Sequence, residues 1–262
     1  MFSILKFEMK VSFKQLLIWA LSVGGMGFFC VILYKSMESS MAEMANNFAS
    51  MGSFSAAFGM DKLSIATIKG YFATEIGTIH SLGSAMFAAS IATVILSKEE
   101  DGHTTEFIFT LPVSRVKIII IKYLSVLINV ILFTCICSIF YLVSFFIIKA
   151  DGMGKDFFVF MLSQLMMNIE VASICFMISA VSKKNKIGVG IGVALVLYFF
   201  DMMARVIPDL KDAIIITPFS YSNAADIFTN TNRTAALAIG IIITLFFIVL
   251  SGTVYGNRDL NS

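Results

Sequence analysis

The sequence IIIIKYLSVLINVILFTCICSIFYLVSFFII, residues 118–148, is apolar at most positions and carries a single charged side chain, Lys122. The hydrocarbon core of a bilayer is about 30 Å thick, and a helix needs about 20 apolar residues to cross it. This stretch is longer, so we expect a membrane-spanning helix that tilts or projects beyond the bilayer. It indicates an integral membrane protein.

The composition of the whole chain agrees with this hypothesis. Of the 262 residues, 58% are hydrophobic and 14% are charged, and the mean hydropathy is +0.90, whereas soluble domains are about half apolar and a quarter charged. A formal net charge of +2, with scattered basic residues, argues against a nucleic-acid-binding protein. Five further windows of span length lie at residues 16–34, 77–97, 157–181, 187–206 and 235–255. We therefore predict an all-α fold with six transmembrane helices in one domain, residues 1–262.

Lysine and arginine in the short loops predict the orientation of the spans. The turn 182–186 carries Lys183, Lys184 and Lys186. With that turn inside the cell, the outer loops are longer and their basic residues are more widely spread. Both termini are therefore expected in the cytoplasm, in a multi-pass protein of the cell membrane.

The segments that flank the first predicted span have helical periodicity of their own. Residues 1–15 place apolar and lysine side chains on different faces. This pattern predicts an interfacial elbow helix, and a plain extension of the first span is the alternative. The segment 35–76 should lie outside, and its stretch from Met37 to Met51 has heptad-like methionines that predict an amphipathic helix. That helix would either meet an apolar substrate or rest on the bundle or the outer leaflet.

Two groups of small residues predict close packing between helices. Gly188 and Gly192 form a GxxxG motif in the fifth predicted span. The second predicted span has small residues along one side: Gly77, Ser81, Ala85, Ala88 and Ala92.

The chain lacks the motifs of a nucleotide hydrolase or a metalloenzyme. It has no GxxxxGK[ST] phosphate loop and no HExxH, and its two histidines, His80 and His103, do not form a Ser/His/Asp set. Its four cysteines lie within apolar runs, which favours buried thiols over disulfides or a zinc site. We expect no catalytic residue, no metal and no cofactor in this chain.

The loop 98–117 reads KEEDGHTTEFIFTLPVSRVK and has the pattern of a short helix lying across the membrane face. Acidic residues end the second span, Gly102 permits a chain reversal, and Thr105 or its neighbour Thr104 can cap a new helix. Glu106 suits the positive end of that helix, and Pro112 stops it. We expect a cytoplasmic helix between the second and third spans, and an amphipathic connector that rests on lipid is the alternative.

This loop resembles the coupling region of the ABC-2 type permease family. Shorter likenesses occur at Leu17–Trp19 and Thr217–Tyr221, so the resemblance covers essentially the whole chain. His103 and Thr104 depart from the family, in which the glycine is often followed directly by threonine. The residues that match are Glu99, Glu100, Gly102, Thr105, Glu106, Leu111, Pro112, Val113, Ser114 and Arg115.

The resemblance implies a bacterial exporter made of two permease copies, identical or related, and two copies of a soluble ABC ATPase. ATP and magnesium would bind the ATPase subunit, and the loop helix would dock in a groove on it. Phe107 and Leu111 lie one helical turn apart and would supply the apolar ridge of that contact. Bacterial members handle peptide antibiotics and cytolytic peptides, so the expected substrate is amphipathic or apolar.

Polar side chains inside the predicted spans are candidates for a substrate pathway. Glu170 lies near the middle of the fourth span, where a carboxylate is costly and is a functional hypothesis by default. Gln164 and Asn168 lie on a nearly opposite face of that span, and Asp201 is nearer the outer end of the fifth. A structural role for Glu170 is equally compatible with the sequence. An ion-coupled transporter that uses Glu170 and Asp201, or a sensing or immunity subunit, is the alternative function.

Overall fold

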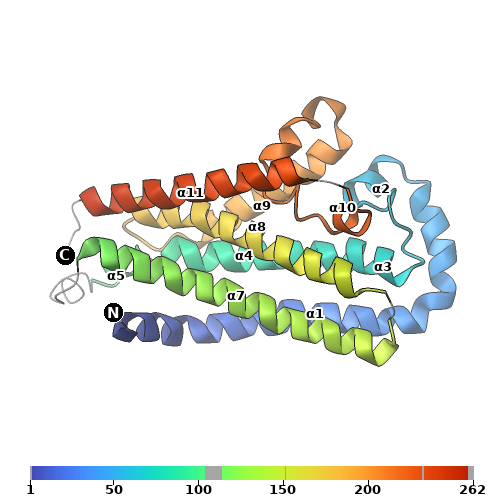
Figure 1. The fold of residues 1–262 in the computed structure, drawn as a ribbon, viewed down its shortest axis with the longest axis horizontal. Helices are drawn as coiled ribbons and strands as arrows, with labels where there is room; N and C mark the ends of the chain where they lie inside the picture. Colours follow the sequence, from blue (N-terminus) through green and yellow to red (C-terminus); the bar gives the residue numbers. More distant parts are fainter. Residues whose placement is uncertain (1, 104–113, 151, 232, 259–262) are drawn as a thin grey trace.

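The computed structural model describes residues 2–103, 114–150, 152–231 and 233–258, and this part of the chain is helical with no strand. Five of its helices are long and apolar enough to cross a membrane. They run side by side along one axis (Figure 1). These helices are α1 (Phe2–Ala49), α7 (Arg115–Ile148), α8 (Gly154–Val181), α9 (Ile187–Val206) and α11 (Thr234–Asn257). A multi-pass, all-helical membrane protein is thus confirmed.

The second predicted span forms helix α4 (Gly77–Val94), which is not among those five helices. It packs against α8 and α9, and also contacts α1 and α7. Twelve of its 18 residues are buried, many of them small or polar. Because α4 is largely enclosed by protein, it needs less apolar surface than a lipid-facing helix. Its role as a sixth span stays a prediction.

The first helix, α1, is continuous, so the segment 2–15 agrees with the alternative prediction, an extension of the first span, and the interfacial elbow helix is not confirmed. The stretch from Met37 is helical as far as Ala49, as predicted, and it continues α1. No proline interrupts it. Its central glycines instead permit close contact with α7: a Cβ on Gly24 would lie 3.3 Å from the Cα of Cys137. The remainder of segment 35–76 forms α2 (Ser53–Phe58), α3 (Ile68–Tyr71) and the π-helix η1 (Phe72–Ile76).

The bundle has two distinct ends. At the terminal end lie the start of α1, the end of α11 and the short helix α5 (Lys98–Asp101) (Figure 1). At the opposite end lie α2, α3 and α10 (Ala224–Phe228). Two 3-10 helices, η2 (Pro208–Leu210) and η3 (Ala213–Ile216), connect α9 to α10.

Small residues do bring helices together, although one predicted motif does not. The stripe on α4 is buried, as predicted. In α9 the contact residue is Gly190, where a Cβ would meet the Thr93 side chain and lie 3.0 Å from the Ala89 carbonyl oxygen of α4. A Cβ on Gly188 or Gly192 would meet nothing within 4 Å. Among the described residues the GxxxG pair therefore makes no packing contact, since these two glycines lie on another side of α9.

Candidate functional site

The predicted coupling loop is described only at its two ends. Residues Thr105, Glu106, Phe107, Leu111 and Pro112 lie outside the described part of the chain. Glu99 and Glu100 belong to α5, and both are buried. The left-handed turn after α5 is made by His103, with φ 51°, whereas Gly102 has φ −88°. The reversal predicted at Gly102 is thus one residue later.

Glu99 belongs to a buried cluster of four charges that joins three helices. Lys122 of α7 is fully buried and donates to Glu99 Oε1 at 2.7 Å and to Glu8 Oε1 of α1 at 2.8 Å. Its third hydrogen bond, at 2.8 Å, goes to the Ile95 carbonyl oxygen. Lys98 forms an ion pair with the other oxygen of Glu8. An ammonium group has three donors, and here all three have acceptors.

Glu100 is held from the other side by the C-terminal end of the chain. It forms an ion pair with Arg258, which follows α11. The Arg258 guanidinium also donates to the carbonyl oxygens of Ala180, at 2.8 Å, and Ser182, at 3.2 Å, at the end of α8. Arg115, at the start of α7, donates to the Arg258 carbonyl oxygen at 3.1 Å. The start of the coupling loop is therefore fixed to α1, α7, α8 and the end of α11.

These ion pairs fix geometry more than they add stability. Burying a charge costs several kcal/mol, which the partner offsets only when the geometry is good. Removing one partner costs about 3–5 kcal/mol, because the other charge is left buried alone. The carboxylates of Glu99 and Glu100 thus make their contacts within the chain, rather than offering charge at its surface.

The four candidate pathway residues each have different surroundings. Gln164 donates to Ser81 Oγ of α4 at 2.7 Å and to the Ser222 carbonyl oxygen at 2.8 Å. Glu170 accepts a hydrogen bond from the Tyr221 hydroxyl at 2.8 Å, and its second oxygen has no partner among the described residues. Asn168 is buried, and both of its side-chain polar atoms have no partner in that same part of the chain.

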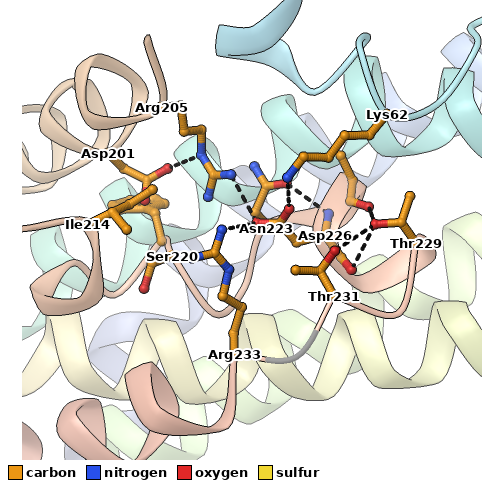
Figure 2. A network of polar contacts seen from close by, with 12 residues as sticks. Lys62, Asp201, Arg205, Ile214, Ser220, Asn223, Asp226, Thr229, Thr231 and Arg233 are labelled. Atoms are coloured by element: carbon orange, nitrogen blue, oxygen red, sulfur yellow. Dashed lines mark hydrogen bonds and ion pairs between the residues drawn. The ribbon is translucent and has the colours of Figure 1, made fainter. Parts of the chain in front are cut away.

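Asp201, the fourth candidate, belongs to an ionic network at the opposite end (Figure 2). Its carboxylate accepts from Arg205 Nε at 2.7 Å and from the Thr217 hydroxyl at 2.7 Å. Arg205 also donates to Asp226 Oδ2 at 2.9 Å. The structure therefore pairs Asp201 with an arginine and does not bring it together with Glu170.

Asp226 is the centre of this network. Three cations converge on its buried carboxylate: Lys62, Arg205 and, at 3.3 Å, Arg233 (Figure 2). Burial by itself raises the pKa of Asp226, but Arg205 and Lys62 outweigh that effect and hold the pKa below its ordinary value of 3.8. The carboxylate therefore stays ionised at neutral pH. Asn223 caps α10 by accepting from the Asp226 backbone N–H at 3.2 Å, which fixes the position of the carboxylate.

A cavity of about 550 Å³ adjoins this network. Lys62, Arg205, Lys211 and Arg233 line it together with the acidic residues Asp61 and Asp212. Its remaining lining is alanine, glycine and isoleucine from α2, α9, η3 and the start of α11. None of the four predicted pathway residues lines this cavity.

Sequence reasoning missed Glu8, Lys122 and Asp226 as organising residues. For Lys122 a signal was available, because an ionisable residue within a predicted span is a site hypothesis by default. Glu8 and Asp226 lie in polar segments, where a single carboxylate carries no such signal. Within the described residues, no group of three or more His, Cys, Asp or Glu side chains is arranged to hold a metal ion.

The amino-acid sequence matches a known protein family. A family model described as "ABC-2 family transporter protein" matches residues 2–260. No curated protein matches the chain.

Proposed function

Because the chain belongs to the ABC-2 family of transporter proteins, we propose that it is the membrane-spanning subunit of an ATP-driven exporter. The family match over residues 2–260 is the observation that carries this proposal. The five long apolar helices are consistent with it, since a permease provides the path across the membrane. Outward transport is proposed from the resemblance of the coupling loop to bacterial exporters.

The energy would come from a separate ATPase subunit, as is typical of permeases in this family. The chain has no phosphate loop of its own. We propose an assembly of two permease copies and two ATPase copies, in which the loop 98–117 contacts the ATPase. The inward contacts of Glu99 and Glu100 support a revised role for these two residues: they hold the loop in place, and the apolar ridge provides the docking surface.

The proposed substrate is amphipathic or apolar, such as a peptide, an antibiotic or a drug. The ion-coupled alternative requires carboxylates that exchange ions, and Asp201 is already paired with Arg205. A sensing or immunity subunit would bind its ligand without moving it. ATP-dependent accumulation of substrate in inside-out vesicles, unaffected by collapse of ion gradients, supports the exporter over both alternatives.

The coupling loop gives the first prediction. The double variant Phe107→Ala, Leu111→Ala should insert normally but retain at least tenfold less ATPase on purification, because interface energy concentrates in a few buried anchors. Pull-down from detergent with the purified ATPase, followed by ATP hydrolysis measured with and without substrate, tests this.

The matched control is Phe7→Ala, Val11→Ala. These two exposed apolar residues of α1 are also four positions apart and lie near the terminal end. The control should retain the ATPase. Full association and full substrate stimulation in the Phe107, Leu111 variant would contradict the proposed docking surface.

A further inference from the structure

One residue, Arg258, contacts both ends of the proposed coupling loop. Its guanidinium forms an ion pair with Glu100 of α5, at the start of the loop. At the other end of the loop, Arg115 begins α7 and donates to the Arg258 carbonyl oxygen at 3.1 Å. The two ends of the loop therefore meet at the residue that follows α11.

The same guanidinium caps helix α8. This helix ends at Val181, and the last carbonyl oxygens of a helix have no partner within it. Arg258 Nη1 donates to the Ala180 carbonyl oxygen at 2.8 Å and to that of Ser182 at 3.2 Å. A cation at this position also suits the negative end of the helix dipole. Arg258 thus fixes the end of α8 to the end of α11, and the coupling loop to both.

Burial makes this junction stiff. The side chain of Arg258 is 16% exposed, and that of Glu100 is 2% exposed. The buried ring of Tyr255, in the last turn of α11, lies 5.5 Å from the guanidinium, a distance typical of a cation–π contact. Exposed ion pairs separate easily, whereas separating a buried pair is costly because it leaves each charge alone. A displacement of α5 should therefore move the ends of α8 and α11 with it.

We propose that Arg258 is a positioning residue that transmits movement of the coupling loop to α8 and α11. The inference rests on the proposed function, in which the ATPase binds this loop, and it adds the route by which the movement reaches the spans. Helices α8 and α11 pack together, and Gly240 of α11 lies against Glu170 of α8. A movement that begins at the loop thus reaches a candidate pathway residue through two packed helices.

The first test measures the distance between the loop and α8 in the complex of the full chain with its ATPase. Spin labels are placed at Asp101 of α5 and Lys184 after α8, both exposed positions, on a background without the native cysteines. Labelled chain is diluted with unlabelled chain, and distances are recorded without nucleotide and with MgATP and vanadate. In the wild type the distance distribution should be narrow and unchanged by nucleotide, because the loop and α8 move together.

The substitution Arg258→Met removes the donors and keeps much of the side-chain length. It should broaden the distance distribution at least twofold, and nucleotide should now shift the distance, because the loop moves without α8. The ATPase should still be retained on pull-down, since the apolar ridge is untouched. Arg258→Lys keeps the charge and three donors and should restore the narrow distribution. The matched control is Lys186→Gln, which removes an exposed lysine from the turn after α8 and should match the wild type.

A double-variant cycle on the chain alone, in detergent, keeps the inference testable if Arg258→Met folds poorly. Glu100→Gln removes the partner charge and leaves the guanidinium on the carbonyl oxygens of α8. It should broaden the label distance in the same way. Each single variant should lower the unfolding temperature, and the double variant should lower it by less than the sum, because no buried charge is left alone.

The outcomes separate this inference from the proposed function. A wild-type chain that retains no ATPase contradicts the proposed function and, with it, the transmission. Normal association, combined with equal label distances in the wild type and Arg258→Met in both nucleotide states, overturns the inference alone. Additive losses in the double-variant cycle would also overturn it, because they would show that Glu100 and Arg258 are not in contact.

Discussion

Among individual residues, Glu170 best shows how an interior carboxylate is accommodated. Tyr221, from the loop before α10, donates to one of its oxygens, and Gly240 of α11 lies against the pair. A Cβ at position 240 would lie 2.9 Å from the Tyr221 ring, so only glycine leaves enough room. This contact connects α8, α11 and the loop, whatever role the negative charge has in transport.

The substitution Glu170→Gln separates the charge from the contact. The amide oxygen of glutamine can still accept from Tyr221, so yield and unfolding temperature should be retained. A carboxylate within a span is costly, and its charge is not needed for this hydrogen bond, so we expect the charge to serve transport. ATP-driven transport in reconstituted vesicles should therefore fall in the variant. Tyr221→Phe is the comparison, which should lower stability by about 1–3 kcal/mol because it leaves the acceptor unpaired. Unchanged transport by a stable Glu170→Gln protein would make Glu170 a purely structural residue.

At the level of helices, the contact between α4 and α9 depends on one glycine. Gly190 is the buried member of the run from Gly188 to Gly192, and it faces Thr93 and Ala89. Thr93 is buried as well and donates to the Ala89 carbonyl oxygen at 2.7 Å, so neither neighbour can easily move.

Gly190→Val should therefore separate α9 from α4 and destabilise the fold by about 1–3 kcal/mol, as overpacking of a core does. Gly192→Val is the matched control in the same helix, since a Cβ there meets nothing within 4 Å. Thermal unfolding of the monomeric chain in detergent measures both. Equal unfolding temperatures for the two variants would show that α4 and α9 do not pack as described.

At the scale of the whole molecule, single-cysteine labelling tests the predicted orientation in the membrane. On a background in which the four native cysteines are replaced by serine or alanine, cysteines at Lys184 and Gly256 should react only from the cytoplasm. Cysteines at Asp61 and Asp209 should react only from outside. The physical reason is the excess of lysine and arginine in the short loops of the terminal end. Labelling of position 184 by an impermeant reagent in intact cells would reverse this topology.

Local sequence patterns predicted the positions of the long helices well. The window 187–206 coincides with α9, and 157–181 lies within α8, because apolar runs bounded by polar or charged turns define span-length helices. The sequence left the continuity of α1 open, since the same periodicity fits an elbow helix or an extension of the first span. The partners of Glu99, Glu170 and Asp201 were missed, because those contacts join segments that have no relation in the local pattern.

The cluster around Lys122 has a consequence for how the protein is made. Glu8 precedes Lys122 by 114 residues and Lys98 by 90 residues. At about 5–20 residues synthesised per second, Lys122 leaves the ribosome roughly 6–23 s after Glu8. Lys98 leaves the ribosome only somewhat earlier, roughly 5–18 s after Glu8. Until then the carboxylate of Glu8 has neither of its lysines, and until Lys122 appears it has only one, and an unpaired charge does not readily leave water. The first turns of α1 should therefore stay at the membrane surface during synthesis. The helix α1 should reach its final position only after α7 has been inserted.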